Sequence, residues 1–291
     1  MGEHAAIAAL TANLNAVGDD CAVLPMNEEY DLVLTSDPLI ENVHFTPDAS
    51  PEQIGHKAVC RVLSDFAAMG AEPQYLLINL VAPPEQNFQT LEKIYAEFSP
   101  SGPLRAGSLL EKYGVELVGG DLAQGPVLEL HVFGVGRVPK GTALLRSGAQ
   151  PGDFIYVTGP LGGAQKRGKQ YSFEPRLEWG RALRESGKVT AMMDISDGLA
   201  TDLRHILKAS GVGAELESSK IPTIGKLENA LYDGEDFELL FTVPSGESLP
   251  DIGTKKKAAM LWVGKITDCR EELLIDGVAV RNKAFEHFKG E

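Results

Sequence analysis

The sequence predicts a two-domain α/β fold, with a mixed sheet and helices in the first half and a second α/β unit after it. Apolar runs of strand length alternate with longer stretches of helical periodicity along the chain. The 291 residues suffice for two hydrophobic cores. A polar connector containing Gly and Pro, residues 139–152, separates the two halves. We therefore expect domains at residues 1–138 and 139–291.

In the first half, the order of the expected elements indicates a mixed sheet covered by helices. The expected strands are residues 21–24, 31–37, 74–81, 115–118 and 127–138, and the expected helices are residues 1–16, 51–69 and 88–113. The helix at 51–69 has a continuous apolar face, from which Lys57 and Arg61 are expected to point away. Gly70 would end this helix, and Pro100 and Pro103 would break or kink the next one.

The second half is organised around residues 191–207, AMMDISDGLATDLRHIL. A short apolar strand is expected to end at Asp194, followed by Ser196 as the N-cap of a helix that Gly211 terminates. Further strands are expected at residues 154–158, 214–217, 237–243, 260–266 and 273–275. This half therefore has the elements of a second α/β domain.

Composition excludes several classes of function. A net charge of −14 opposes nonspecific binding to DNA or RNA, which requires basic surfaces. No apolar run approaches the length of a membrane span, and the N-terminus has no basic region before its apolar part, so we expect neither a membrane segment nor a signal peptide. Three cysteines far apart favour neither a disulfide framework nor a zinc site. We expect a cytoplasmic protein.

Aspartates stand at the ends of several expected strands and helices: Asp20, Asp37, Asp65, Asp121, Asp194 and Asp197. Functional groups of α/β sheets concentrate at such ends, where loops open a crevice. Carboxylates converging there would repel one another unless cations bound them, and oxygen ligands suit Mg²⁺. Gly119 and Gly120 beside Asp121 would let the backbone approach a ligand. The pattern predicts a magnesium–polyphosphate site, although helix capping alone would also explain one such turn.

Other phosphate-binding and catalytic motifs are incomplete. Residues 163–170, GAQKRGKQ, match the P-loop spacing only until Gln170, where Ser or Thr should hold Mg²⁺. Pro175 follows too soon for the helix that a P-loop requires, so a basic surface loop is the better interpretation. The sequence has neither the dinucleotide-binding glycine spacing nor a Gly-x-Ser-x-Gly elbow.

Three further features have two interpretations each. Arg146, on the connector, is either a bidentate phosphate ligand or an exposed arginine. His44, in an expected loop, is more often a solvated side chain than a ligand contact. Residues 233–238, DGEDFE, have an acidic turn before a strand as their default interpretation.

Several of these stretches, in this order, resemble the thiamine-monophosphate kinase family, within the superfamily that includes aminoimidazole ribonucleotide synthetase and selenophosphate synthetase. The matching segments are residues 18–24, 35–37, 43–45, 63–71, 119–121, 145–153, 194–199 and 234–241. They span most of the chain, and VHF at 43–45 and GEDFELLF at 234–241 look most like the thiamine-phosphate enzymes. The reactive Cys or selenocysteine expected of a selenophosphate synthetase has no equivalent here.

The resemblance implies a reaction and an assembly. The N-terminal domains would pair in a homodimer through a barrel-like interface. ATP and thiamine monophosphate would give ADP and thiamine diphosphate by direct, Mg-assisted transfer of the γ-phosphoryl group. Substrate positioning and charge neutralisation supply most of the catalysis of phosphoryl transfer. This agrees with a sequence that has aspartates at the ends of several expected elements and no catalytic triad.

The resemblance also assigns roles to residues. Several Mg²⁺ ions would be held by Asp20, Thr35, Ser36, Asp37, Asp65, Asp121, Asp194 and Asp197. Asp37, Asp65 and Asp121 would be the catalytic residues among them. ATP would be bound by Gly120, Asp121, Arg146 and Ser196. Thiamine monophosphate would contact His44, Glu235 and Phe285.

The sequence departs from the family pattern at several positions. Leu122, Ala123 and Gln124 replace Thr-Thr-Arg-like residues. Val62 replaces a common Asn, and Pro103 stands near an expected ATP-contacting Tyr. Two alternatives therefore stay open: another ATP-using synthetase of the same superfamily, or a catalytically weak protein that binds nucleotide or thiamine phosphate.

Overall fold

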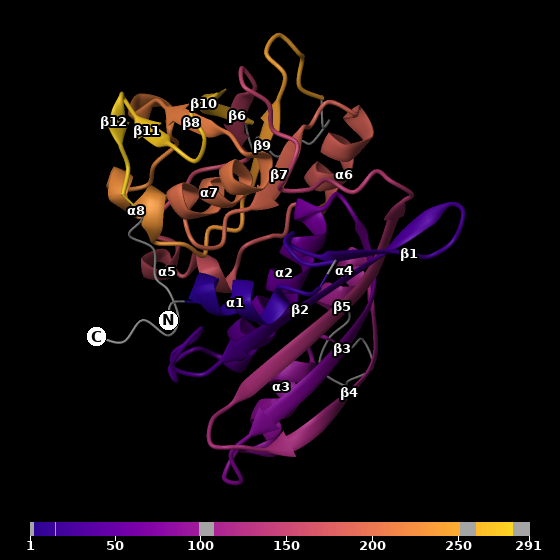
Figure 1. Ribbon diagram of the computed structural model, residues 1–291. Coiled ribbons are helices and arrows are strands. Elements are labelled where there is room, and N and C mark those ends of the chain that lie inside the picture. Colours follow the sequence, from indigo (N-terminus) through magenta and orange to yellow (C-terminus); the bar gives the residue numbers. More distant parts are fainter. Residues whose placement is uncertain (1–2, 15, 99–107, 251–259, 282–291) are drawn as a thin grey trace.

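The computed structural model describes residues 3–14, 16–98, 108–250 and 260–281, and within them each half of the chain builds one sheet (Figure 1). The first sheet has the strand order β1-β2-β5-β3-β4, and the second has the order β12-β11-β8-β10-β6-β9-β7. Helices pack on both sheets, so the predicted two-domain α/β fold is confirmed.

The sheet of the first half is mixed. Its strands are β1 (Ala22–Pro25), β2 (Tyr30–Ile40), β3 (Glu72–Ala82), β4 (Glu116–Gln124) and β5 (Glu129–Pro139). β3 and β4 run parallel, and the other neighbouring strands run antiparallel. In the described residues this sheet is open and does not close into a barrel within one chain.

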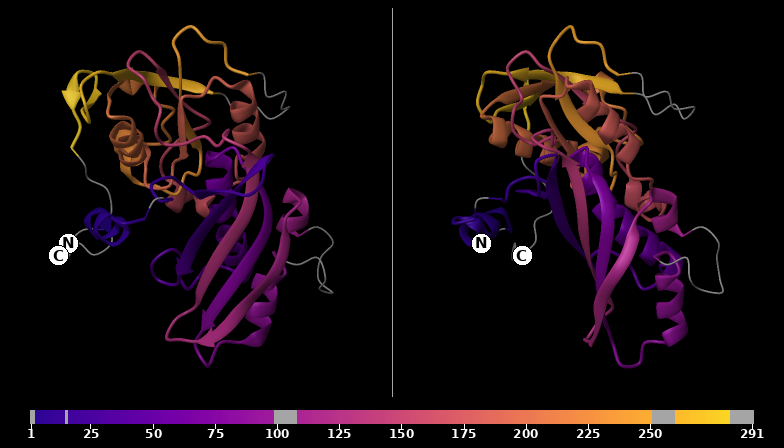
Figure 2. Two further views of the ribbon diagram at one scale, coloured as in Figure 1. Left: turned by 45° about the vertical axis from the view of Figure 1, so that its right-hand side comes forward. Right: turned by 90° about the vertical axis from the view of Figure 1, so that its right-hand side faces the viewer.

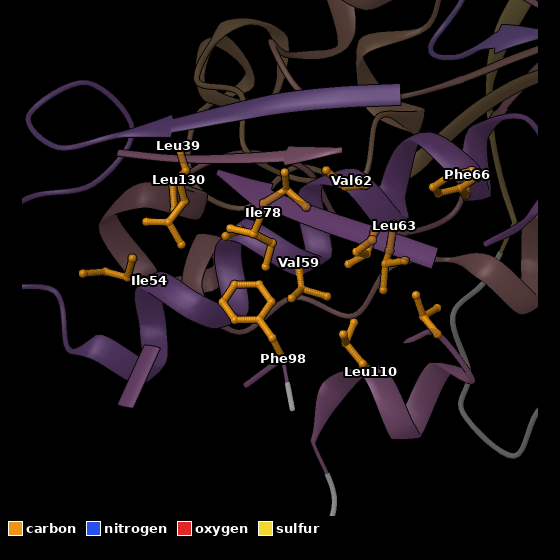
Figure 3. Packing of buried hydrophobic residues seen from close by; sticks show 14 of the residues in the cluster. Leu39, Ile54, Val59, Val62, Leu63, Phe66, Ile78, Phe98, Leu110 and Leu130 are labelled. Atoms are coloured by element: carbon orange, nitrogen blue, oxygen red, sulfur yellow. The ribbon is translucent and has the colours of Figure 1, made fainter. Parts of the chain in front are cut away.

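Helices cover one face of this sheet and leave the other face open (Figure 2). The covering helices are α2 (Pro51–Ala68), α3 (Phe88–Tyr95) and α4 (Leu109–Tyr113), and α1 (Glu3–Thr11) precedes β1. A capping box between Ser50 and Gln53 begins α2. The apolar side of α2 packs on the sheet, with Val59 beside Ile78 of β3 (Figure 3) and Phe66 against Gly134 and Gly136 of β5. The helix predicted at 88–113 is divided into α3 and α4; Pro100 and Pro103 lie outside the described residues.

The second half surrounds its sheet with short helices. The strands are β6 (Phe154–Val157), β7 (Ala191–Asp194), β8 (Gly213–Leu216), β9 (Leu239–Val243), β10 (Leu261–Thr267), β11 (Leu273–Ile275) and β12 (Val278–Ala279). The helices are α5 (Ala164–Arg167), α6 (Leu177–Ser186), α7 (Leu199–Ser210) and α8 (Leu227–Tyr232), with 3₁₀ turns η1 (Lys169–Tyr171) and η2 (Ser218–Lys220). Among all helices of the described ranges, none has the length and apolar composition needed to cross a bilayer.

The two halves meet where α6 packs on α2. Gly180 of α6 brings the helices so close that a Cβ at this position would lie 2.0 Å from the carbonyl oxygen of Ala67. Trp179 and Leu183, on the same helix as Gly180, are buried in an apolar cluster to which both halves contribute. The contact holds α2 between the two sheets and directs its polar side chains towards the junction.

Gly180→Ala is expected to lower the free energy of unfolding by about 3 kcal/mol, since the backbone of Ala67 cannot yield to the added methyl group. Urea unfolding followed by circular dichroism measures the change. Glu178→Ala, at an exposed position of the same helix, is the matched control and should stay within about 0.5 kcal/mol of the parent. Equal stabilities for both variants would contradict the close contact.

Candidate active site

An acidic cavity of about 220 Å³ lies at the junction of the two halves. It is bordered by Asp19, Asp20, Thr35, Ser36, Asp37, Arg61, Asp65, Arg146, Asp194, Ser196 and Phe237. These residues come from the segment before β1, from β2 and α2, from the connector, from the end of β7 and the turn after it, and from the turn before β9. Folding therefore brings together four of the aspartates that the sequence places at separate element ends.

The periodicity of β2 and α2 positions the acidic groups of the first half. Strand alternation turns Thr35 and Asp37 towards α2 and turns Ser36 towards the open face of the sheet. Thr35 Oγ1 donates to Asp65 Oδ2 at 2.5 Å. Arg61, one helical turn before Asp65, places Nε 3.3 Å from Asp37 Oδ2. The strand and the helix thus present their carboxylates to the same space.

The second half contributes the turn after β7. Asp194 is buried, and Ser64 of α2 donates its hydroxyl hydrogen to Asp194 Oδ2 at 2.5 Å. The prediction that Ser196 caps α7 is wrong, because the N-cap is Gly198. The Asp202 carboxylate instead accepts hydrogen bonds from the backbone N–H groups of Asp197 and Gly198, each at 3.0 Å. This arrangement leaves Ser196 at the border of the cavity.

Arg146 extends from the connector into the same cavity. Its Nη2 lies 2.5 Å from Asp20 Oδ1, and its backbone N–H donates to Asp19 Oδ1 at 2.6 Å. The side chain is only 21% exposed, so the interpretation of an exposed arginine is wrong. A guanidinium in this place can bind two oxygens of a phosphate group bidentately once it leaves Asp20.

Burial and mutual repulsion oppose ionisation of the cavity carboxyl groups. Burial raises the pKa of Asp65 well above its ordinary value, and the charges of Asp37, Asp194 and Asp20 add to the effect. Burial also raises the pKa of Asp194 to about 7, with Asp20 adding to the shift. The pKa of Asp20 is raised by burial, while Arg146 acts in the opposite direction. A bound cation would offset this repulsion.

The donor chemistry of the cavity fits Mg²⁺, which prefers carboxylate, hydroxyl and water oxygens. Oδ2 of Asp20 is buried and has no hydrogen-bond partner among the described residues. In this part of the chain, no three His, Cys, Asp or Glu side chains already form a coordination shell. Instead, Thr35, Ser64 and Arg146 donate hydrogen bonds to the carboxylates. A cation would replace these donors at the carboxylate oxygens and would take its other ligands from water and phosphate.

A second cavity, of about 450 Å³, adjoins the first and shares Arg61, Ser196 and Phe237 with it. Its border consists of Val43, His44, Arg61, Gln165, Ser196, Asp197, Tyr232, Asp233, Gly234, Glu235 and Phe237. His44 and Glu235 therefore lie at one cavity, and Asp197 lies here and not at the acidic cavity. A carboxylate among aromatic side chains suits a ligand that carries a cationic ring.

The turn that carries Glu235 has a constrained backbone. Glu235 and Phe237 have φ values of 62° and 50°, which residues other than glycine rarely adopt. Their backbone N–H groups donate to the carbonyl oxygens of Ser196 and Ile195 at 2.7 and 2.8 Å. Strain of this kind persists where surrounding contacts impose it, as they do at ligand-binding turns.

The interpretation of residues 233–238 as an ordinary acidic turn is wrong, because Asp236 and Glu238 are 0% and 1% exposed. Arg176 donates to both carboxylate oxygens of Glu238 at 2.8 Å, and Lys169 donates to Oε1 at 3.0 Å. Lys169 stands where a P-loop would have its phosphate-binding lysine. Its ion pair with Glu238 agrees with the rejection of a P-loop, while Lys166 and Arg167 are exposed, as expected of a basic surface loop.

Gly120 and Asp121 border neither cavity. They continue β4, three strands away from β2, which is about 14 Å at the usual strand spacing. The strand end predicted at residue 118 is therefore wrong: a Cβ at Gly120 would lie 1.9 Å from the carbonyl oxygen of Ile78, so the glycine permits strand pairing. Asp121 is exposed on the open face beside Asn79. Phe285 lies outside the described residues.

Comparison with known proteins identifies the family. Residues 18–138 match the family described as AIR synthase related protein, N-terminal domain, and residues 150–249 match the corresponding C-terminal domain. The chain is 37% identical to the thiamine-monophosphate kinase of Salmonella typhimurium over 78% of this chain and 76% of that one. It is 34% identical to that of Haemophilus influenzae over 94% of this chain and 92% of that one. The chain belongs to the thiamine-monophosphate kinase family.

Solved structures agree with this membership. The structure "AaThiL complexed with AMPPCP and TMP" superimposes with a TM-score of 0.86 at 28% identity, covering 99% of this chain and 97% of that one. Thiamine-monophosphate kinase from Stenotrophomonas maltophilia superimposes with a TM-score of 0.74 at 30% identity, covering 95% of this chain and 96% of that one. The two-domain arrangement thus extends over nearly the whole chain.

The polar side of α2 was not predicted as part of the site of this thiamine-monophosphate kinase family member. Lys57, Arg61 and Asp65 recur at intervals of four residues, which places them along one side of the helix. Lys57 points away from the apolar face, as expected, but its burial was not predicted, since the side chain is 0% exposed. Val62 is buried in the core, which accounts for an apolar residue at that position.

Proposed function

We propose that this chain transfers the γ-phosphoryl group of ATP to thiamine monophosphate, giving ADP and thiamine diphosphate. The observation that carries the proposal is the pair of adjoining cavities. One offers carboxylates for a metal-bound polyphosphate, and the other offers Glu235 and aromatic side chains for a second ligand. The similar structure that contains AMPPCP and TMP supports the same pair of ligands.

The acidic cavity is the proposed site of the ATP phosphates and several Mg²⁺ ions. Asp20, Thr35, Asp37, Asp65 and Asp194 would hold the ions there, and the family resemblance adds Ser36, Asp121 and Asp197. Bound Mg²⁺ would supply neutralisation of phosphate charge. Arg146 would bind a phosphate oxygen, and Ser196 would contact ATP where the two cavities join.

The larger cavity is the proposed site of thiamine monophosphate. Glu235 would face the cationic ring system, and His44 borders the same cavity. The phosphate of this ligand would point towards Ser196 and Arg61, which border both cavities. Such an arrangement positions donor and acceptor phosphates without a protein nucleophile.

We also propose a homodimer formed through the open face of the first sheet. Tyr75, Leu77 and Phe133 are 42%, 36% and 38% exposed there, and Leu77 lies directly opposite Phe133. An uncovered apolar face of this kind favours an interface, and the family resemblance implies a second copy as its occupant. Asp121 lies on the same face. A two-fold axis along the strands would bring β4 of one protomer over β2 of its partner.

The domain boundary after residue 138 and a cytoplasmic location are further proposals. β5 ends at Pro139 and β6 begins at Phe154, so the connector carries no strand between them. Cys21, Cys60 and Cys269 are free thiols, which fits a reducing compartment.

The proposed function is tested by incubating the purified chain with ATP, thiamine monophosphate and Mg²⁺. Chromatography is expected to show ADP and thiamine diphosphate in equal amounts, and chelation of Mg²⁺ is expected to stop their formation because the phosphates then repel the cavity carboxylates. ADP formation at a rate that does not depend on thiamine monophosphate would favour another synthetase of the superfamily. Binding of both ligands without product would favour a binding protein.

A further inference from the structure

Lys57 is completely buried although it carries a charged group. Its Nζ lies 2.9 Å from Glu235 Oε2 and donates to the backbone carbonyl oxygen of His44 at 2.6 Å. His44 stands in the loop before α2, and Glu235 stands in the turn before β9. One buried cation therefore joins two segments that both border the larger cavity.

The 3₁₀ turn η1 closes over this ammonium group. Lys57 Nζ donates to Gln170 Oε1 at 3.4 Å and lies 5.5 Å from the centre of the Tyr171 ring. The adjacent Lys169 ties η1 to Glu238. Burial lowers the pKa of Lys57, and Glu235 counteracts that effect. Because burying a charge is costly unless it is paired, the ion pair with Glu235 is the contact that sustains Lys57 at this position.

We propose that Lys57 is a positioning residue that fixes the carboxylate of Glu235 for the thiamine ligand. The inference rests on the proposed function for the identity of that ligand. Oε2 of Glu235 is buried without a hydrogen bond of good geometry, so the ion pair holds its orientation. Lys57 is not among the residues that border the cavity, and it therefore acts through Glu235. The carboxylate of Glu235 would therefore be preorganised for the cationic ring before the ligand binds.

Lys57→Met tests the proposal by calorimetric titration with thiamine monophosphate and, separately, with AMPPCP and Mg²⁺. The Kd for thiamine monophosphate is expected to rise on the order of 10- to 100-fold, the range seen when a group that orients a ligand contact is removed. The Kd for the nucleotide should stay unchanged. No change for either ligand, or an equal loss for both, would overturn the proposal.

Lys112→Met is the matched control for this substitution. Lys112 Nζ lies 2.9 Å from Glu174 Oε1, the same separation as in the buried pair, but its side chain is 48% exposed. Screening by solvent makes such a pair weak. Both Kd values should therefore equal those of the wild-type chain, and a loss of thiamine monophosphate binding here as well would overturn a specific role for Lys57.

A double variant controls for misfolding, since Lys57→Met leaves the buried Oε2 of Glu235 without its partner. Lys57→Met with Glu235→Gln removes both charges, and its Kd for thiamine monophosphate should equal that of Glu235→Gln alone. Further weakening would show that Lys57 acts independently of Glu235 and would overturn the proposal. A wild-type chain that binds thiamine monophosphate without forming product would refute the proposed function, while the ratios of Kd values would still decide the role of Lys57.

Discussion

Asp65→Asn is expected to reduce kcat on the order of 1000-fold without lowering thermal stability. Asp65 lies in the acidic cavity among Asp20, Asp37 and Asp194, where its charge would bind Mg²⁺. The amide oxygen can still accept the hydrogen bond from Thr35, so the packing is retained. Steady-state kinetics across a range of Mg²⁺ concentrations, together with thermal unfolding in EDTA, measures both effects.

The pH dependence of stability provides a second measurement on the same variant. Burial raises the pKa of Asp65 above its ordinary value of 3.8, so the unfolded chain releases this proton at lower pH than the folded chain does. Stability of the metal-free protein therefore falls as the pH rises above about 4, towards the raised pKa of the folded state. The asparagine variant should lose less stability over this range.

Asp31→Asn is the control, because Asp31 also lies on β2 but accepts a hydrogen bond from the Gly141 N–H outside both cavities. We expect this variant to keep wild-type kcat. Wild-type turnover by Asp65→Asn would exclude Asp65 from the reaction. A large fall in its melting temperature would instead show that the carboxylate serves the fold.

The acidic cavity was largely predictable because its signals are local. Asp37 follows an apolar strand, Asp65 stands near the end of an amphipathic helix, and Asp194 ends a buried strand. Each position follows from hydrophobic periodicity over a few residues. The prediction that the strand before Asp121 ends at residue 118 failed for an equally local reason. Gly120 can signal either a turn or a close approach of strands, and only the partner strand distinguishes them.

The buried cations were not predictable from local patterns. Lys57 looks like part of the solvated side of a helix until Glu235 and Gln170 of the second domain cover it. Glu238 looks like part of a hydrophilic turn, because the partner that neutralises it, Arg176, is distant in the sequence. Burial of a charge depends on tertiary pairing, and hydrophobic periodicity carries no information about it. The interval of four residues from Lys57 to Asp65 was the one available hint.

Asp121→Asn is expected to abolish turnover, even though Asp121 borders neither cavity of its own chain. The residue is exposed on the open face of the sheet, on the strand that the proposed dimer would place over β2 of the second copy. Its carboxylate would then complete the acidic cavity of the partner. Size-exclusion chromatography with light scattering should show a dimer for this variant, because the apolar residues of the face are unchanged.

Coexpression of Asp121→Asn with Asp65→Asn decides between a contribution to the partner's site and one within the chain. If Asp121 serves the partner, each mixed dimer contains one intact site, and random pairing restores roughly a quarter of wild-type activity. Asp20→Asn coexpressed with Asp65→Asn is the matched control, since both residues border the same cavity of one chain, and it should stay inactive. Absence of recovery in the first mixture would place Asp121 outside the partner's site, because every dimer would then lack an essential carboxylate in each copy.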